Sequence, residues 1–148
     1  MEMGRVSVSK VRVLVADDHE AMLAQVCTVL GEEFDIVGTV SNGRDAIAEV
    51  ERLDPDVLVI DISMPVLDGL RAVSLLGLDR RVRVVFLTLH EDRAFVAAAF
   101  SAGASAYVVK SDIVTDLAPA IRAALEGHRY ISRSISPIVE APSSGIES

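Results

Sequence analysis

The chain has 148 residues, a formal net charge of −8 and 51% hydrophobic residues. Its length fits one domain, and its apolar content excludes a largely disordered protein. The negative charge argues against nonspecific binding of this chain to nucleic acid, which requires a basic face. The single cysteine, Cys27, excludes an intramolecular disulfide, and no spacing of Cys and His residues indicates zinc.

The sequence shows neither a membrane-spanning segment nor a secretory signal. The longest uncharged stretch, residues 94–109, is shorter than the ~20 apolar residues that a membrane span needs, so we expect no membrane association. Residues 1–10 carry charges and lack an apolar core followed by a small-residue cleavage site, so they do not predict a secretory signal. We therefore expect a cytoplasmic protein.

Apolar runs alternate with amphipathic segments along the chain. Five runs predict strands, at residues 11–16, 34–40, 57–61, 82–88 and 104–109. Apolar residues at three-and-four spacing predict helices near residues 22–30, 46–53, 70–78, 91–102 and 116–125. Pro119 would break the interior of a longer last helix, so we place its start near Asp116, with the proline in the first turn.

Strands that alternate with helices predict a doubly wound α/β fold, with a parallel sheet, right-handed crossovers and helices on both faces. We place a polar lead at residues 1–10 and the domain at residues 11–132. Residues 133–148 are rich in Ser and Pro and have no hydrophobic period, which is typical of a linker or disordered tail.

Polar side chains stand at the ends of four predicted strands. Asp17 and Asp18 follow the first, Asp61 ends the third, Thr88 ends the fourth and Lys110 follows the fifth. Because the carboxyl ends of parallel strands meet at one edge of a sheet, we expect these side chains to lie together. Taken alone, each has a simpler explanation as a turn or helix cap, an ordinary strand residue or a solvated charge. All of these separate explanations would have to hold at once for the five residues to have no joint function.

Electrostatics favour a joint function for these residues. Two carboxylates ~5 Å apart repel by roughly 3 kcal/mol at an effective dielectric near 20, so a cluster of three persists best with a bound cation. A hard ion such as Mg²⁺ takes few carboxylates and keeps waters and a phosphate oxygen among its ligands. The ammonium of Lys110 and the hydroxyl of Thr88 complete a set of groups that stabilises a phosphoryl group.

Four motifs occur in a specific order: DD at residues 17–18, DISMP at 61–65, TLH at 88–90 and AYVVK at 106–110. With these motifs, residues 11–132 resemble a response-regulator receiver domain of two-component signalling. The resemblance implies a flavodoxin-like (βα)5 fold, whose five-stranded parallel sheet has the strand order 2-1-3-4-5.

The resemblance also implies a phosphoacceptor and a metal site. Asp61 is the phosphoacceptor, a nucleophile that forms an acyl phosphate. Mg²⁺, with Mn²⁺ as the alternative ion, is held by Asp17, Asp18, Asp61 and the backbone carbonyl of Ser63. His19 is not expected among the ligands, because receiver sites use oxygens there.

Further residues match positions that act on the phosphoryl group or respond to it. Thr88 and Lys110 are expected to contact the phosphoryl oxygens. Tyr107 is expected to be the switch aromatic, which turns inward when Thr88 moves toward the phosphate, although an ordinary strand tyrosine is the simpler alternative. Ser63 and His90 stand where the family tunes the lifetime of the acyl phosphate, and His90 also fits an ordinary loop residue.

The sequences DDH, AGASAYVVK and GHRYIS are most similar to the NarL/FixJ group, whose members usually continue into a LuxR-type helix-turn-helix. This sequence ends where that part would begin. The resemblance implies a histidine kinase or phosphotransfer protein as donor, a phosphorylation-dependent homodimer, and transcription regulation through a DNA-binding part outside this chain. A stand-alone receiver that acts through protein contacts is the alternative.

Two other classes fit the residues less well. Haloacid-dehalogenase-type phosphatases also use a strand-end aspartate and Mg²⁺, but they carry a second acid two residues later, where this chain has Ser63. A phosphate-independent interaction module would predict the loss of one or more of the five strand-end residues, and none is missing. We therefore expect a switch that promotes its own phosphorylation and dephosphorylation, not a turnover enzyme.

Overall fold

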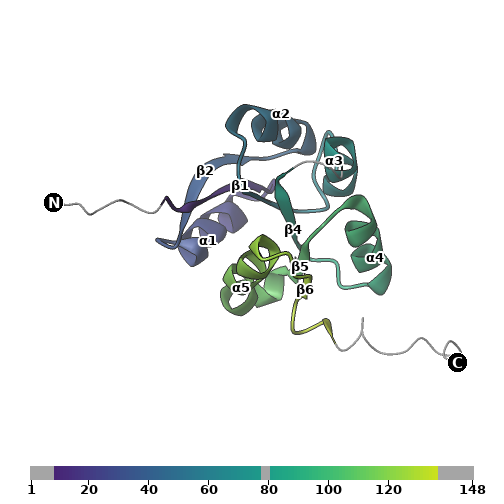
Figure 1. The fold of residues 1–148 in the computed structure, drawn as a ribbon. Coiled ribbons are helices and arrows are strands. Elements are labelled where there is room, and N and C mark those ends of the chain that lie inside the picture. The colour runs from purple at the N-terminus through teal and green to yellow at the C-terminus, as the bar shows by residue number, and fades with distance from the viewer. Residues whose placement is uncertain (1–8, 78–80, 137–148) are drawn as a thin grey trace, which may run out of the picture.

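The computed structural model describes residues 9–77 and 81–136, in which five helices cover one parallel sheet (Figure 1). The strands are β1 (Val11–Ala16), β2 (Phe34–Val40), β3 (Val57–Ile60), β4 (Arg83–Thr88), β5 (Ala106–Val109) and β6 (Tyr130–Ile131). The helices are α1 (Glu20–Leu30), α2 (Gly43–Leu53), α3 (Gly69–Leu76), α4 (Arg93–Ala102) and α5 (Ile113–Leu125), with a 3-10 turn, η1 (Lys110–Asp112), before α5. No helix in the described ranges is long and apolar enough to cross a membrane.

The strand order is β2-β1-β3-β4-β5-β6, which confirms the flavodoxin-like fold and the order predicted for the first five strands. The sheet is larger than predicted by one strand, β6, which pairs in parallel with β5 through Ala106 with Tyr130 and Tyr107 with Ile131. A strand of two residues has no period to detect, so sequence patterns missed it.

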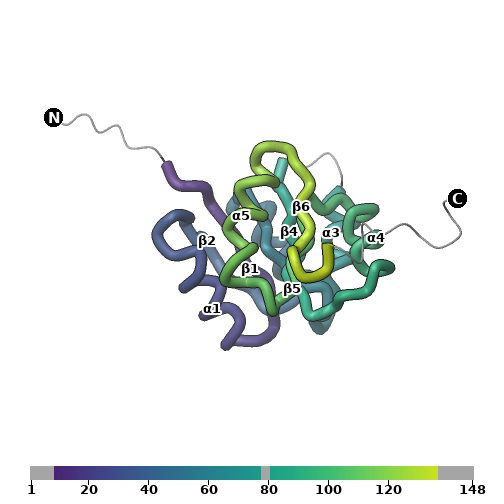
Figure 2. Tube along the Cα trace, turned by 90° about the horizontal axis from the view of Figure 1, so that it is seen from below, coloured from purple at the N-terminus to yellow at the C-terminus, as the bar shows by residue number. Residues whose placement is uncertain are grey.

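Helices α1 and α5 cover one face of the sheet, and α2, α3 and α4 cover the other (Figures 1 and 2). Successive strand side chains point to opposite faces, so a central strand contributes to both cores. In β3, Val57 and Val59 join the core under α1 and α5, whereas Leu58 and Ile60 join the core under the other three helices. All four are buried, and Asp61 follows directly after them at the end of the strand.

The last helix differs from its prediction. Helix α5 begins at Ile113, not near Asp116, so Pro119 lies inside the helix instead of in its first turn. A proline there removes the hydrogen bond to the carbonyl of Thr115, four residues earlier. The buried side chains of α5 pack against the sheet, and this packing outweighs the local cost; they include Ile113, Leu117, Ala120, Ile121 and Ala124.

Three other helices end at the residues predicted, Leu30, Leu53 and Ala102. Gly31 after α1, Asp54 after α2 and Gly103 after α4 are the C-caps, with φ angles of 45°, 48° and 117°. Helix α3 ends at Leu76. Leu78, which the predicted α3 pattern included, lies outside the described residues.

Residues 130–136, here called the C-terminal segment, are attached to α5 through a buried carboxylate. Asp116 accepts hydrogen bonds from Tyr130 OH (3.0 Å), the backbone N–H of Arg133 (2.8 Å) and Arg133 Nε (2.9 Å). Burial alone would raise the pKa of Asp116, but these hydrogen bonds, one from Thr115 and the charge of Arg133 outweigh it and lower the pKa. The packed region therefore extends into residues that the sequence interpretation placed in the tail, while residues 137–148 lie outside the described range.

We expect Asp116→Asn to lower the free energy of unfolding by about 1–3 kcal/mol near neutral pH, because it weakens several hydrogen bonds to a charged acceptor. Since folding lowers the pKa of Asp116, its carboxylate stabilises the fold above the unfolded-state value of about 4. That contribution is lost as the pH falls through the folded-state pKa. Urea unfolding of wild type and variant across this pH range measures the effect.

Asp35→Asn is the matched control, since Asp35 is an exposed aspartate on β2. It is expected to change the free energy of unfolding by less than about 0.5 kcal/mol. A deficit in Asp116→Asn that stays constant from neutral to acidic pH would contradict the assignment of this stability to the carboxylate.

Candidate functional site

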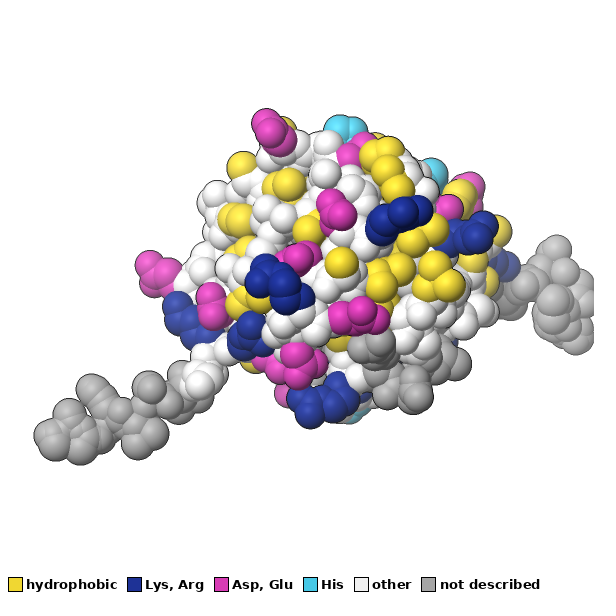
Figure 3. Space-filling view, turned by 90° about the horizontal axis from the view of Figure 1, so that it is seen from above, with side chains coloured by type: hydrophobic (Ala, Val, Ile, Leu, Met, Phe, Trp, Pro, Cys, Tyr) yellow, Lys and Arg dark blue, Asp and Glu magenta, His cyan; other side chains and the backbone are white. Residues whose placement is uncertain are grey.

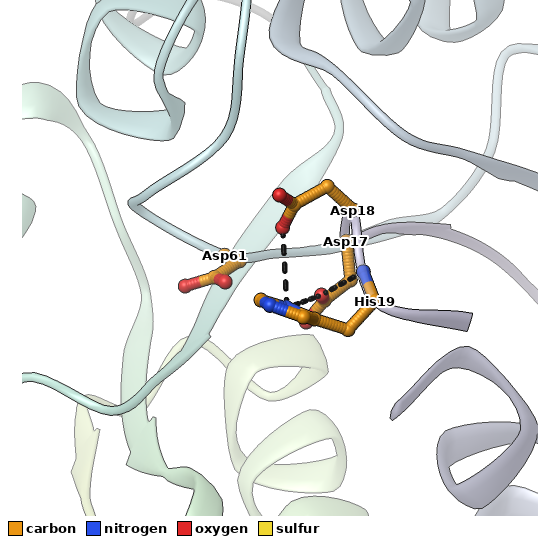
Figure 4. A group of neighbouring side chains, drawn as sticks. All are labelled: Asp17, Asp18, His19 and Asp61. Atoms are coloured by element: carbon orange, nitrogen blue, oxygen red, sulfur yellow. Dashed lines mark hydrogen bonds and ion pairs between the residues drawn. The ribbon is translucent and has the colours of Figure 1, made fainter. Parts of the chain in front are cut away.

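Three aspartates from two neighbouring strands meet at the carboxyl edge of the sheet. Asp17 and Asp18 follow β1, Asp61 follows β3, and the backbone N–H of Asp61 donates to the carbonyl of Ala16 at 3.0 Å. One ligand atom from each aspartate and one from His19 lie within 4.8 Å of one another (Figure 4). The structure thus brings together the acids that the strand-end pattern placed at this edge.

Lys110 lies against two of these acids. Its Nζ is 2.7 Å from Asp17 Oδ2 and 3.0 Å from Asp61 Oδ2, and Asp17, Asp61 and Lys110 are only 2%, 4% and 7% exposed. Burial favours the neutral amine, but the contacts with both carboxylates and their charges outweigh it and raise the pKa of Lys110. A permanent ammonium is therefore held beside Asp61.

His19 shares this cluster, although the sequence interpretation left it out of the ligand set. Its Nδ1 is 3.2 Å from Asp17 Oδ1 and 3.2 Å from Asp18 Oδ1, and the ring lies between the two carboxylates (Figure 4). Its backbone N–H donates to Asp17 Oδ1 at 2.9 Å, which fixes the turn after β1. The His19 side chain is largely exposed, whereas Asp17 is buried.

The residues present fit a hard divalent cation. The buried Asp17 Oδ2 has no hydrogen-bond partner among the described residues, so its contact with Lys110 is an ion pair without hydrogen-bond geometry. Three carboxylates against one ammonium leave a net negative site, and carboxylate oxygens are the ligands that Mg²⁺ prefers. A cation here would give Asp17 Oδ2 a ligand bond in addition to its ion pair with Lys110.

A chain of polar contacts leads from Thr88 to Tyr107. Thr88, fully buried at the end of β4, accepts a hydrogen bond from the backbone N–H of His90 at 3.3 Å. The carbonyl of His90 accepts one from Tyr107 OH at 2.8 Å. The His90 ring stacks on Phe95 with centroids 4.1 Å apart, and its Nε2 is hydrogen-bonded to Ser63 Oγ at 2.8 Å.

The Tyr107 ring points into the protein. Tyr107 is 0% exposed, and its burial, followed by the negative charges of Asp92 and Asp61, raises the pKa of its phenol. The phenol therefore remains protonated and donates to His90. The sequence interpretation expected the ring to turn inward when Thr88 moves toward a phosphate, and that movement stays a prediction.

A cleft of about 610 Å³ opens beside the acids. Its lining combines the polar residues Asp18, Ser63, Asp68 and His90 with the apolar residues Ile62, Met64, Pro65, Leu70 and Phe95. A second groove of about 400 Å³ between α3 and α4 shares only Leu70 with this cleft and reaches none of the aspartates of the cluster. Figure 3 shows the molecule from above, where hydrophobic side chains lie between charged ones.

Gly69 shapes the loop after Asp61, a role that the sequence patterns did not indicate. A Cβ at Gly69 would lie 2.0 Å from the backbone carbonyl oxygen of Asp61, and the Gly69 N–H donates to the carbonyl of Ile62 at 2.7 Å. A similar approach occurs at Gly43, where a Cβ would lie 2.1 Å from the carbonyl oxygen of Leu67. The loop is therefore closely packed at both of its ends.

Gly69→Ala is expected to lower the free energy of unfolding by about 1–3 kcal/mol, because the backbone around Asp61 must move to admit the methyl group. Gly38→Ala is the matched control, since its Cβ would meet only the side-chain ends of Leu14 and Leu53 at 3.3 Å. Urea unfolding of both variants measures the difference. If Gly69→Ala and Gly38→Ala lower the free energy of unfolding equally, the backbone of the loop moves as easily as the ends of flexible side chains, and the prediction is wrong.

A family model, the response regulator receiver domain, matches residues 13–122. The chain belongs to this family. The match contains the acid cluster, Lys110, Thr88 and Tyr107, so the receiver domain recognised in the sequence is confirmed.

Relatives and solved structures agree with this membership. The chain is 37% identical over 122 residues to the transcriptional regulatory protein PdtaR of Mycobacterium tuberculosis, covering 82% of this chain and 60% of that protein. It is 33% identical over 129 residues to the response regulator GacA of Pseudomonas viridiflava, covering 85% of this chain and 60% of that protein. The chain thus spans about 60% of the length of these curated relatives.

Solved receiver structures have the same fold. A two-component response regulator of the LuxR family from Aurantimonas sp. SI85-9A1 matches with a TM-score of 0.83 and 29% identity over 88% of this chain and 96% of that one. The isolated REC domain of RcsB from Salmonella enterica serovar Typhimurium, in the presence of phosphomimetic BeF3−, matches with a TM-score of 0.80 and 26% identity over 89% of this chain and 100% of that one. The similarity to LuxR-type regulators agrees with the predicted NarL/FixJ group.

Proposed function

We propose that this receiver domain accepts a phosphoryl group on Asp61 from a phosphohistidine donor in a Mg²⁺-dependent reaction, and that the resulting acyl phosphate switches the conformation of the domain. The observation that carries the proposal is the buried pairing of Asp61 with Lys110, inside a cluster of carboxylates that opens to a cleft. The ammonium of Lys110, 3.0 Å from Asp61 Oδ2, balances the charge of the carboxylate that would act as the nucleophile.

In the transfer, an oxygen of Asp61 forms a bond to phosphorus while the bond from phosphorus to the donor nitrogen breaks, and the electron pair of that bond leaves with the imidazole. The attack is in line with the leaving group. Lys110 balances charge on the phosphoryl oxygens, and Thr88 donates its hydroxyl to one of them. Mg²⁺, held by Asp17, Asp18, Asp61 and the backbone carbonyl of Ser63, would neutralise the developing negative charge when bound.

The proposed switch uses the contacts that reach Tyr107. If Thr88 turns its hydroxyl to the phosphoryl group, it changes its contact with the N–H of His90, whose carbonyl accepts from Tyr107. Ser63 and His90, hydrogen-bonded at the mouth of the cleft, are positioned to set how readily water reaches the acyl phosphate. A phosphoryl group that stabilises one conformation by about 5.5 kcal/mol more than the other would convert a 1:99 population into 99:1.

Family membership supports a proposal for the partners of the switch. We propose a sensor histidine kinase or phosphotransfer protein as donor, action in the cytoplasm and a phosphorylation-dependent homodimer. Related structures include two RcsB dimers bound to two parallel DNAs. Since this chain spans only part of its relatives, we propose that transcription control requires a DNA-binding part beyond the receiver, with a stand-alone receiver as the alternative.

The test is incubation with acetyl phosphate and Mg²⁺, followed by intact mass spectrometry. We expect one phosphoryl group per chain with Mg²⁺, and none when EDTA removes the ion. Absence of a phosphoryl group under both conditions would overturn the proposal. Sustained multiple turnover of a small phosphate ester such as p-nitrophenyl phosphate would instead favour an aspartyl-phosphate phosphatase.

A further inference from the structure

The C-terminal segment, residues 130–136, is fastened to the domain by two acids on the α5 side of the sheet. Asp116 holds Tyr130 and Arg133, as described above. Asp112, in η1, accepts from Ser132 Oγ and, through the same Oδ2, from Ser134 N at 3.1 Å and Ser134 Oγ at 2.7 Å. Burial raises the pKa of both acids, but hydrogen bonds outweigh it and lower the pKa: those from Ser132 and Ser134 for Asp112, and those from Thr115, Arg133 and Tyr130 for Asp116.

The other side of the segment lies along Tyr107. In the parallel pairing of β5 and β6, Ile131 is the partner of Tyr107, and the N–H of Ser132 donates to the carbonyl of Tyr107 at 2.8 Å. Ile135 is 1% exposed and belongs to the same core cluster as Tyr107, against which Ile131 also packs. The segment therefore covers the sheet edge on which the tyrosine lies, and Figure 2 shows its path beside β5.

We infer that the C-terminal segment is a strap that holds the Tyr107 ring inward, and that its attachment to Asp112 and Asp116 is coupled to phosphoryl binding at Asp61. The second half of this inference rests on the proposed function. The first half concerns the unphosphorylated chain and can be tested without any phosphoryl group.

Two physical connections run between Asp61 and the strap. On one, Lys110 contacts Asp61 through Nζ and shares the three-residue turn η1 with Asp112, which binds Ser132 and Ser134. On the other, the Thr88 to His90 contact leads to Tyr107 OH, and the Tyr107 backbone bonds Ser132. A group that draws Lys110 and Thr88 toward Asp61 therefore acts on the strap at two points, Asp112 and Tyr107.

For Tyr107 to turn outward, its ring must leave the core that Ile135 helps to close, and the strap must move. Detachment of the strap, conversely, removes the cover that keeps the ring inward. If the inward ring is the form that binds a phosphoryl group, linkage requires that strap attachment and phosphoryl binding favour each other by the same factor. A variant that weakens strap attachment must therefore weaken phosphoryl binding by a matching factor.

The test measures hydrogen exchange at the backbone amides of Ser132, Ser134 and Ile135 in the full chain, together with the affinity for beryllofluoride with Mg²⁺ as a phosphoryl mimic. Asp112→Ala removes the acceptor of two serines and leaves Asp17, Asp61 and Lys110 in place. We expect exchange at these amides to be about fivefold or more faster in the variant and beryllofluoride binding to weaken by a similar factor. In wild type, saturation with beryllofluoride is expected to slow the same amides by that factor.

Glu33→Gln is the matched control, because it breaks an exposed ion pair between Glu33 and Arg122 of α5 that does not involve the strap. It is expected to leave exchange in the strap and beryllofluoride affinity unchanged. Tyr107→Ala tests only the contact between the strap and the Tyr107 ring. We expect this variant to accelerate hydrogen exchange in the strap of the unphosphorylated protein. Urea unfolding of each variant confirms that it is folded before exchange is compared.

The outcomes separate the two ideas. Faster exchange in Asp112→Ala with unchanged beryllofluoride affinity would reduce the strap to a purely structural element and overturn the coupling. Unchanged strap exchange in Tyr107→Ala would overturn the hold on the ring. If wild type binds neither beryllofluoride nor a phosphoryl group, the proposed function and the coupling fail together, whereas the hold on Tyr107 is decided by exchange in the unphosphorylated chain.

Discussion

Asp61→Asn is expected to reduce phosphoryl acceptance from acetyl phosphate to background, a loss of at least about 10³-fold. The amide keeps the shape of the carboxylate but has no anionic oxygen to attack phosphorus. Asp61 follows the central strand β3 and accepts a hydrogen bond from Lys110. This position makes it the expected acceptor among the three aspartates. Intact mass spectrometry over a time course, with Mg²⁺ present, measures the loss.

The variant is expected to stay folded, so the loss can be assigned to chemistry. Lys110 keeps its ion pair with Asp17, and the cluster loses one of three mutually repelling charges. The exposed Asp35→Asn on β2 serves as the matched control and is expected to accept a phosphoryl group at the wild-type rate. Equal labelling of Asp61→Asn and wild type would place the acceptor elsewhere, with Asp17 and Asp18 as the first residues to map.

The composition of this edge of the sheet was predictable because one geometric rule governs it. Parallel strands end on the same side, so Asp17, Asp61, Thr88 and Lys110 could be grouped from four separate apolar runs. The alternation of cores also followed, since a buried run such as Val57–Ile60 must face both helix layers. The grouping of polar residues at the strand ends and the burial of strands on both faces both depend on apolar runs, which can be recognised in the sequence one at a time.

Other features depend on tertiary contacts that no local pattern carries. Helix α5 contains Pro119 because its apolar side chains pack against the sheet, although local propensity favours a later start. Strand β6 is held by the ladder with β5 and by the buried Asp116, a residue that in sequence is one more acid on a helix. Gly69 differs from an ordinary turn glycine only through the carbonyl of Asp61 that faces it.

The Ser63 to His90 contact shows the same limit at the site itself. Family resemblance placed both residues near the phosphoryl group, yet their 2.8 Å hydrogen bond joins loops that are 27 positions apart. His19 was set aside on the ligand chemistry of the family, and only the folded chain brings its ring between Asp17 and Asp18. Which residues belong to the site is therefore easier to predict from the sequence than which of them contact one another.

Lys110→Met is expected to lower the free energy of unfolding by about 3–5 kcal/mol in the absence of Mg²⁺. The change keeps the length of the side chain but leaves Asp17 and Asp61, both buried, without their positive partner. Lys10→Met is the matched control, because Lys10 is exposed, and it is expected to alter stability by less than about 0.5 kcal/mol. Urea unfolding in EDTA measures both.

A double variant and Mg²⁺ test the cause of this loss. Adding Asp17→Asn to Lys110→Met removes one of the unpaired charges, so the double variant is expected to be more stable than Lys110→Met alone. Mg²⁺ at about 100 times its dissociation constant would stabilise wild type by about 2.7 kcal/mol, and Asp17→Asn is expected to abolish most of this gain. If Lys110→Met unfolds with the wild-type energy and Asp17→Asn does not alter the response to Mg²⁺, the carboxylates are neither held by the lysine nor arranged for a cation.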